Sequence, residues 1–374
     1  MNNRLSSNLL FGLAAATFLS VTAFAQEVAA ESKGPEVKFS GEVEFDAYTG
    51  DVLNDDKQHH EYASTFDFNV DVKFNEKWSA SVQLEADGAS TDPAAIYNGA
   101  FVQYTQNEKF IVKFGDLTFS EGAFLNYYGY DDPADNAAGM AEHDIRGVEI
   151  DYSGIVFGLG FSRGDNDNQV CTVEDGEESC VGVAYDAHLA YELALGENTL
   201  RPFVDYKSYQ EAEHNELHAG IDANLKFGAF GLHAVYGLHA DYLGEDNPKP
   251  THAILAEPSL AVGNVNVKGS VFYAYFDDDA PTVHGEEIPE YFFAYAEPSV
   301  SVFSALALGI PLEYHTNTID KDEDVSSFDV GVRAYFTPVE GLDVTGFAMV
   351  DIPVGDEAGD DTGLTLGLET VFSF

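Results

Sequence analysis

The sequence predicts an all-β protein: a single transmembrane, antiparallel, up-and-down β-barrel of about eighteen strands. Apolar and polar residues alternate with a period of two from one end of the chain to the other, which gives each strand one apolar and one polar face. The alternating runs are ten to thirteen residues long, and a lipid layer ~25 Å thick, crossed by strands tilted at ~40°, requires about ten residues per strand. Short turns alternate with long acidic loops, as expected for a barrel with two different rims.

The beginning of the chain has the pattern of a secretory signal peptide. Arg4 lies in a short polar start, an apolar stretch runs from Leu9 to Val21, and small residues stand at Ala23 and Ala25. The apolar stretch is shorter than the ~20 residues of a membrane-spanning helix, so we expect export rather than anchoring. The sequence thus divides into a signal peptide at 1–25, a short N-terminal segment at 26–36 and one barrel domain at 37–374.

The clearest hairpin lies near the start of the barrel. From Phe66 to Phe74 every even position is apolar and every odd position is polar, and the alternation resumes at Trp78 after three turn residues. Continued along the chain, the same pattern gives a first strand at Val37–Tyr48 and a last strand at Thr362–Phe374. An even number of strands places both ends of the barrel at one rim.

Sixteen strands is the alternative to eighteen, if Asn98-Gly99 or Pro298 interrupts a pair.

The connections distinguish the two rims. The predicted short turns are Asn75–Lys77, Gln106–Glu108, Ser153-Gly154, Gly196–Asn198, Gly228-Ala229, Gly263-Asn264, Phe303-Ser304 and Thr337–Gly341. The predicted long loops are Gly50–Glu61, Phe119–Glu142, Gly164–Cys180, Asp277–Glu287 and Thr316–Asp324.

The composition is strongly acidic, with 65 Asp and Glu against 17 Lys and Arg and a net charge of -48. Such a chain repels a phosphate backbone, which excludes nucleic acid as a partner. An aromatic content of 13% and 34 glycines are typical of a structured protein rather than a disordered acidic segment.

Cys171 and Cys180 are the only two cysteines of the sequence. They flank an acidic segment between two predicted strands, and in an oxidising compartment a local disulfide between them is the simplest interpretation. A metal site built on the two cysteines is less favoured because no histidine stands near them. We therefore predict a disulfide, no metal and no cofactor.

The last strand, Leu364–Phe374, alternates apolar residues and ends in phenylalanine. In this it resembles the closing strand of bacterial outer-membrane proteins, and the whole barrel resembles the bacterial general porin family. The resemblance implies that Phe372 and Phe374 form the signal read by the barrel-assembly machinery. It also implies insertion in the bacterial outer membrane, contact with its lipid and lipopolysaccharide, and a homotrimer.

The third long connection, Phe119–Glu142, precedes a strand, Arg146–Ser153, that looks like the strand after the third loop of porins. In that family the third loop folds into the channel and narrows it. The resemblance places carboxylates at this constriction: Glu121, Asp131, Asp132, Asp135, Glu142 and Asp144. Opposing basic groups are expected on the pore wall: Lys73, Lys113, Arg201, Lys207, Lys226, Lys268 and Arg333. An acidic loop facing a basic wall creates a transverse field across the passage.

These features predict passive diffusion of small hydrophilic solutes and ions, with no enzymatic activity. The lumen-facing positions carry more acids than bases, which favours a weak preference for cations. One alternative is a sugar-selective, maltoporin-like porin, with an aromatic track supplied by Tyr127, Tyr128, Tyr130, Phe272, Tyr291, Phe293 and Tyr295. The other is a structural or adhesive outer-membrane barrel.

Histidines form a second pattern on the polar face. His218 and His239 fall on adjacent strands around a tight turn, where they can oppose each other, and Asp222 comes near His233. A metal-binding or pH-sensing cluster is one interpretation, and ordinary lumen histidines are the other.

Overall fold

The structure is a computed structural model that describes residues 34–53, 58–87, 97–123, 125, 143–162, 169–174, 177–210, 215–240, 243, 250–275, 291–320, 323–354 and 362–374. The predicted signal peptide and most of the N-terminal segment lie outside these ranges. No helix in the described residues is long and apolar enough to cross a membrane.

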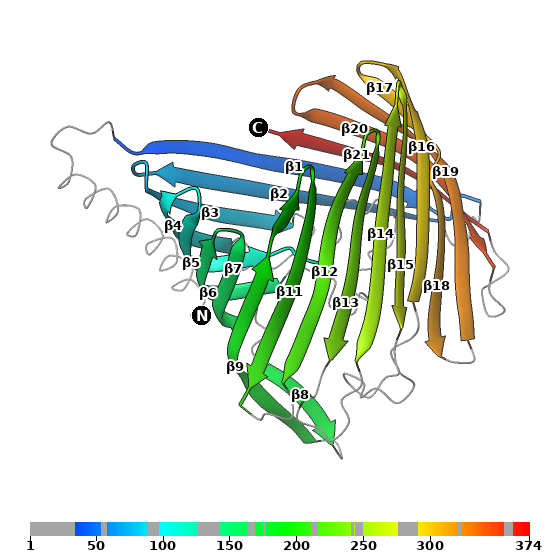
Figure 1. Cartoon of the computed structure of the whole chain (residues 1–374). Coiled ribbons are helices and arrows are strands. Elements are labelled where there is room, and N and C mark those ends of the chain that lie inside the picture. The colour runs from blue at the N-terminus through cyan, green and yellow to red at the C-terminus, as the bar shows by residue number, and fades with distance from the viewer. Residues whose placement is uncertain are drawn as a thin grey trace, which may run out of the picture.

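Twenty-one antiparallel strand segments make up the described structure (Figure 1). They are β1 (Glu36–Gly50), β2 (His59–Lys73), β3 (Trp78–Asp87), β4 (Tyr97–Asn107), β5 (Phe110–Phe119), β6 (His143–Tyr152), β7 (Ile155–Ser162), β8 (Gln169–Glu174), β9 (Glu177–Tyr191), β10 (Leu193–Leu195), β11 (Asn198–Tyr209), β12 (Glu216–Phe227), β13 (Phe230–Ala240), β14 (Thr251–Val262), β15 (Val265–Tyr275), β16 (Tyr291–Phe303), β17 (Leu306–Gly309), β18 (Leu312–Asp320), β19 (Glu323–Val339), β20 (Leu342–Pro353) and β21 (Gly363–Ser373).

The segments form eighteen barrel strands, because β7 with β8, β9 with β10 and β17 with β18 each occupy one place in the wall. The wall closes where β1 pairs with β21, from Glu42 opposite Ser373 to Thr49 opposite Leu366. Gly41 and Phe374 also exchange both backbone hydrogen bonds, at N···O distances of 3.1 and 3.0 Å. The predicted eighteen-strand antiparallel barrel is confirmed.

The two faces of the wall follow the alternation of the sequence. On β1, Phe39 and Phe45 are 62% and 53% exposed on the outer face, and Glu42 and Glu44 between them point into the lumen. β1 thus presents apolar side chains to the outside and acidic ones to the inside, the pattern that a barrel wall needs in lipid.

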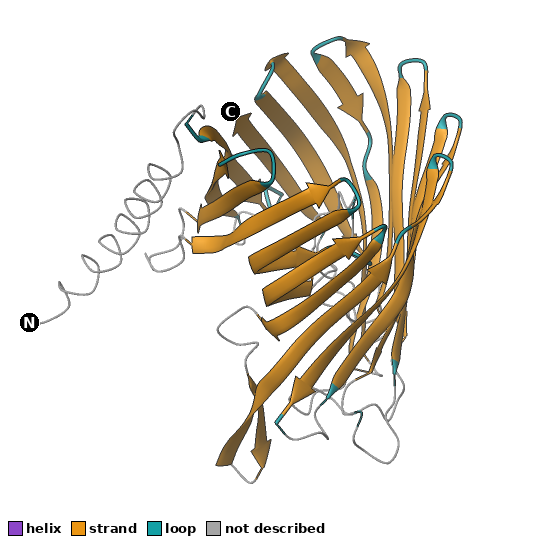
Figure 2. Cartoon of the chain, turned by 60° about the vertical axis from the view of Figure 1, so that its left-hand side comes forward, coloured by secondary structure: helices purple, strands orange, loops and turns teal. Residues whose placement is uncertain are grey.

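Eight tight turns gather at one end of the described barrel, and the hairpin of β8 and β9 extends beyond the other end (Figure 2). The turns at Ser153-Gly154, Gly228-Ala229 and Gly263-Asn264 lie where the sequence predicts them, and the bounds of the other five agree within three residues. Ser153 and Gly154 both have positive φ, 53° and 88°. A two-residue turn with this backbone matches the twist of the strands that it joins.

The wall is interrupted between β17 and β18, at Ile310 and Pro311. Ile310 lies opposite Pro298 of β16 and donates its N–H to the Pro298 carbonyl oxygen, at 3.0 Å. Neither proline has an N–H to give to the ladder, so regular pairing stops here and resumes at Leu312.

Candidate functional site

The candidate site lies in the lumen, where three neighbouring strands each contribute one buried polar side chain. Asp222 of β12, His233 of β13 and Glu257 of β14 are 4%, 3% and 1% exposed. The His233 ring joins the two carboxylates, with Nε2 3.1 Å from Asp222 Oδ1 and Nδ1 2.5 Å from Glu257 Oε2. Ionised carboxylates only accept hydrogen bonds, so the ring donates to both of them when it carries a proton on each nitrogen.

The same two carboxylates hold the beginning of the long loop after β5. The backbone N–H of Gly122 donates to Asp222 Oδ2 at 3.2 Å, and the N–H of Leu125 donates to Glu257 Oε2 at 3.0 Å. These contacts join residues 100 and 132 positions apart in the sequence. The first residues of the loop therefore turn inward as soon as they leave β5 and are bound to the wall at β12 and β14.

Gly122 fits this inward turn for two reasons. Its φ is +89°, a backbone conformation that residues with a Cβ rarely adopt. A Cβ at this position would also lie 2.7 Å from the Phe203 ring, which is buried in the lumen. The close approach of the loop backbone to the wall therefore requires glycine.

Glu121, the predicted constriction carboxylate next to Gly122, also contacts the wall. Its side chain is buried and lies 3.3 Å from Arg201 Nη1 and 3.5 Å from His188 Nε2. Arg201 also pairs through Nε with Glu192 Oε2, at 3.1 Å. One predicted loop acid and one predicted wall base thus meet directly.

Three histidines and two aspartates form a cluster behind Glu121. Asp205 accepts from His188 Nδ1 at 2.6 Å and lies 3.3 Å from His218 Nδ1. His143 Nε2 lies 2.7 Å from Asp186 Oδ1. This cluster connects β6, β9, β11 and β12, and it gives Glu121 a rigid polar support.

The predicted proximity of the histidines is confirmed. His218 lies opposite His239 in the register of β12 and β13, and their ring centroids are 6.2 Å apart. His188 and His143 were not among the predicted site residues. The signal that would have found His188 is its position on the polar face of β9, between Asp186 and Ala190.

A second lumen cluster surrounds Glu297 of β16, which is 1% exposed. Its carboxylate accepts from the hydroxyls of Tyr295 and Tyr335 and lies 3.7 Å from Arg333 Nη1. Arg333, a predicted wall base, is thus held beside a carboxylate and two phenols.

Two more predicted wall bases have acidic partners on the wall itself. Lys113 Nζ lies 3.0 Å from Glu149 Oε1, and Lys207 Nζ lies 3.8 Å from Glu216 Oε2. With Arg201 and Arg333, at least four of the seven predicted bases therefore lie beside carboxylates of the wall. Because most of the predicted loop acids lie outside the described residues, the transverse field stays a prediction.

The remaining predicted residues fall into three groups. Lys73, Lys226 and Lys268 occupy inward positions of β2, β12 and β15. Asp144 points to the outer face, next to the inward Ile145, and accepts from the Thr118 hydroxyl at 2.6 Å. The remaining constriction acids lie outside the described residues: Asp131, Asp132, Asp135 and Glu142.

Asp144 shares the outer face with an unexpected ion pair. Arg146 Nε lies 2.6 Å from Asp116 Oδ1, and Asp116 also accepts from the Tyr97 hydroxyl and the Ala100 N–H. The arginine that the porin resemblance emphasises therefore faces away from the lumen.

The cysteines are placed only by their backbone. Cys171 of β8 lies opposite Cys180 of β9 in the register, the arrangement that a bridge across the hairpin needs. Their side chains lie outside the described part, and the disulfide stays a prediction.

The lumen also contains an apolar cluster of inward residues on β11 and β13–β16. It includes Phe203, Val235, Leu255, Phe272 and Phe293, all at most 4% exposed. Phe272 and Phe293 were predicted to face inward as possible members of an aromatic track, whereas Phe203, Val235 and Leu255 were not predicted. The sequence feature that indicates this cluster is a local loss of alternation, as in residues 253–256 and 271–275, where both faces of the strand are apolar.

No protein-family model matches the chain, and no curated protein matches its sequence. Solved structures do match its fold. OccAB2 of Acinetobacter baumannii has a TM-score of 0.55 at 10% identity and covers 90% of this chain and 98% of that one. The outer membrane protein OpdK of Pseudomonas aeruginosa has a TM-score of 0.53 at 12% identity, with 91% and 99% covered. A BenF-like porin of Pseudomonas fluorescens has a TM-score of 0.54 at 10% identity, with 91% and 98% covered. The chain has the fold of these outer-membrane barrels.

Proposed function

We propose that this barrel is a porin of the bacterial outer membrane, through which small hydrophilic solutes and ions diffuse passively. The observation that carries the proposal is the loop segment bound inside the lumen, with Gly122 and Leu125 hydrogen-bonded to Asp222 and Glu257. A structural or adhesive barrel has no need of a buried polar anchor for a loop at this place. A diffusion channel needs one, because a fixed loop sets the width of the passage.

The way in which the loop is held supports a stable constriction. Both anchors are backbone N–H groups, so they do not depend on the rotamer of a loop side chain. Glu121 adds a charged contact to Arg201. The three anchors lie within residues 121–125, so they fix the position and the direction of this segment at the start of the loop.

We further propose a weak preference for cations. The inward positions of β1 carry Glu42, Glu44 and Asp46, with Asp67 opposite Glu42 on β2 and Glu369 opposite Asp46 on β21. Adjacent strands are ~4.8 Å apart, so these five carboxylates lie within a Debye length of ~8 Å of their neighbours. Their summed potential raises the local concentration of cations.

The arrangement of aromatic residues favours a non-specific pore over a sugar track. Phe272 and Phe293 are 0% exposed and Tyr295 is 3% exposed. A sliding surface for sugar rings must be open to the lumen along its length, and these three rings are covered. Tyr127, Tyr128 and Tyr130 lie outside the described residues, and the side chain of Tyr291 does too.

The partners follow from the same proposal. The apolar outer face would contact lipid and lipopolysaccharide, and the last strand, with Phe372 and Phe374 on that face, would be read by the barrel-assembly machinery. A homotrimer is also proposed. OmpT of Vibrio cholerae, solved in a trimer form, matches this fold with a TM-score of 0.52.

The test is conductance of the purified protein in planar bilayers, with the reversal potential measured across a KCl gradient in the same membrane. We expect stepwise current increments and a reversal potential on the cation-selective side. Absence of conductance, with folded barrels inserted, would refute the porin. Conductance with chloride selectivity would refute only the cation preference.

A further inference from the structure

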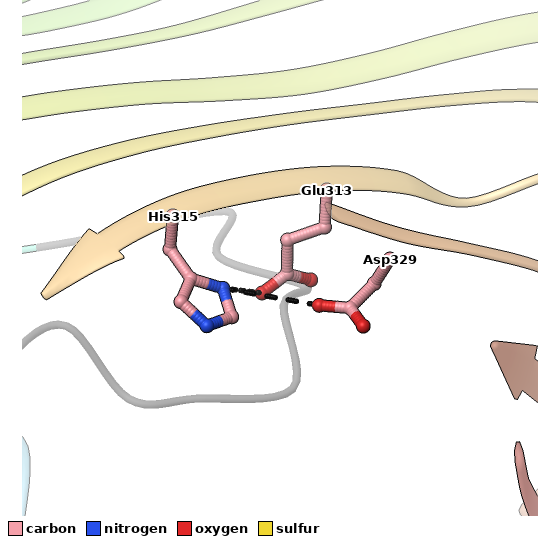
Figure 3. Close-up of side chains that lie close together, drawn as sticks. All are labelled: Glu313, His315 and Asp329. Atoms are coloured by element: carbon pink, nitrogen blue, oxygen red, sulfur yellow. Dashed lines mark ion pairs between the residues drawn. The ribbon is translucent and has the colours of Figure 1, made fainter. Parts of the chain in front are cut away.

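Three side chains with metal-binding atoms meet on the lumen wall between β18 and β19 (Figure 3). Glu313 and His315 are two residues apart on β18, so they share a face of the strand. Asp329 of β19 lies opposite Glu313 in the register. His315 Nδ1 is 3.8 Å from Glu313 Oε1 and 3.8 Å from Asp329 Oδ2. One ligand atom of each residue lies within 4.8 Å of the other two.

These distances suit an ion between the side chains better than direct contact among them. A direct hydrogen bond between a ring nitrogen and a carboxylate oxygen measures about 2.7–3.2 Å, well below 3.8 Å. Ligand atoms at the ~2.1 Å bond lengths of Zn²⁺ lie roughly 3.4 Å apart around a tetrahedral ion. The two His315 distances of 3.8 Å would have to shorten by only about 0.4 Å, and the two carboxylate oxygens, which lie within 4.8 Å of each other, by at most about 1.4 Å.

The charges of the cluster also favour a bound cation. The Glu313 side chain is 1% exposed and that of Asp329 is 10% exposed, and the two carboxylates project from directly paired positions. Two buried carboxylates this close repel each other, and a cation bound between them lowers that repulsion. A divalent cation at this place would take the imidazole as its third ligand.

The histidine is oriented for this role by a fourth residue. His315 Nε2 lies 2.9 Å from the hydroxyl oxygen of Ser327, its partner in the register of β19. When Nε2 donates its proton to Ser327, the lone pair of Nδ1 points between the two carboxylates. Metal-binding histidines are commonly oriented in this way by a hydrogen bond at the other ring nitrogen.

We propose that Glu313, His315 and Asp329 bind a divalent cation of the zinc class on the lumen wall. One nitrogen and two carboxylate oxygens match Zn²⁺, whereas Ca²⁺ and Mg²⁺ prefer oxygen ligands alone. Three protein ligands leave a fourth position for water or for an anionic group of a solute. The site stands on the barrel wall whether or not the barrel conducts, so a binding measurement tests it independently of the proposed porin function.

The test is titration of the detergent-solubilised full-length barrel with Zn²⁺ alone, followed by isothermal calorimetry. Glu313→Gln and His315→Gln should each lower the stoichiometry by one site. Ser327→Ala should keep the site and weaken it about tenfold or more, since it removes only the orienting hydrogen bond. Mg²⁺ at the same concentration should not displace Zn²⁺.

His252→Gln is the matched control, because His252 lies on the outer face, hydrogen-bonded to the Tyr236 hydroxyl at 2.8 Å. It should bind as many Zn²⁺ ions as the wild type. Heat-modifiable gel migration establishes that each variant is a folded barrel, and Asp329→Asn replaces any variant that fails this check. Wild-type stoichiometry and affinity in both Glu313→Gln and His315→Gln, or no Zn²⁺ binding by the wild type, would overturn the proposal.

Discussion

Replacement of His233 by alanine tests the anchor of the lumen loop most directly. The ring is 3% exposed and bonds both Asp222 and Glu257, the two carboxylates that receive the loop N–H groups. His233→Ala leaves these two acids buried, close together and without the group that joins them. Removal of one member of a buried charged network costs ~3–5 kcal/mol.

Part of this loss of free energy is expected to weaken the binding of the loop segment to the wall. The two carboxylates can reduce their repulsion by turning toward water or by taking up a proton, and either change weakens the bonds from Gly122 and Leu125. Every 1.4 kcal/mol lost from docking raises the undocked population about tenfold. A loss of about 3 kcal/mol on the loop would therefore raise it by roughly a hundredfold.

Single-channel recording is the assay. We expect His233→Ala to show larger open-channel noise and a higher mean conductance than the wild type, because the loop no longer holds one position. His252→Ala, on the outer face, should behave as the wild type. Unchanged conductance and noise in a folded His233→Ala barrel would refute the idea that this triad holds the constriction.

Three further changes test separate parts of the structure. Gly122→Val should cost ~1–2 kcal/mol in backbone strain alone and should clash with the Phe203 ring, so the variant should show more open-channel current noise than the wild type. Equal noise in the variant and the wild type would contradict the requirement for glycine. The double substitution Glu44→Gln and Asp46→Asn should lower the ratio of potassium to chloride permeability by roughly two- to fivefold, since each charge interacts with nearby ions by ~1 kcal/mol in water. An unchanged reversal potential would argue against the acidic wall as the source of selectivity. Phe374→Ala removes a ring whose centroid lies 6.4 Å from that of Phe68, a contact worth ~1 kcal/mol. The variant should therefore show a smaller heat-modifiable folded fraction in outer-membrane preparations. A folded fraction equal to that of the wild type would show that the last residue is dispensable.

The sequence was sufficient to predict the wall of the barrel. Period-two alternation determines which face of a strand meets lipid, and the turn at Gly228-Ala229 lies between two such runs. Local pattern also determined the closing strand, whose register with β1 follows from the apolar face on each. These features depend on neighbours in sequence or on one strand at a time, so a single sequence contains them.

The inside of the barrel was harder to predict. The loop anchors join Gly122 to a residue 100 positions away, and no local period encodes such a pairing. Asp144 was expected at the constriction, although its even position, next to the inward Ile145, places it on the outer face. Inward aliphatic residues such as Leu255 were not predicted, because strict alternation places polar residues on the inner face of a strand and gives no sign of an apolar cluster there.

The interruption at Ile310 and Pro311 bears on how the wall resists lateral opening. A closed barrel distributes mechanical load over a continuous ring of backbone hydrogen bonds. Where β17 ends and β18 has not begun, regular pairing is replaced by single bonds, from Ile310 to Pro298 and from Gly331 to Pro311. Amide exchange should be fastest there among wall residues of similar depth. Glu313 follows Pro311 by two residues, so an ion that links it to Asp329 would reinforce the wall next to this interruption.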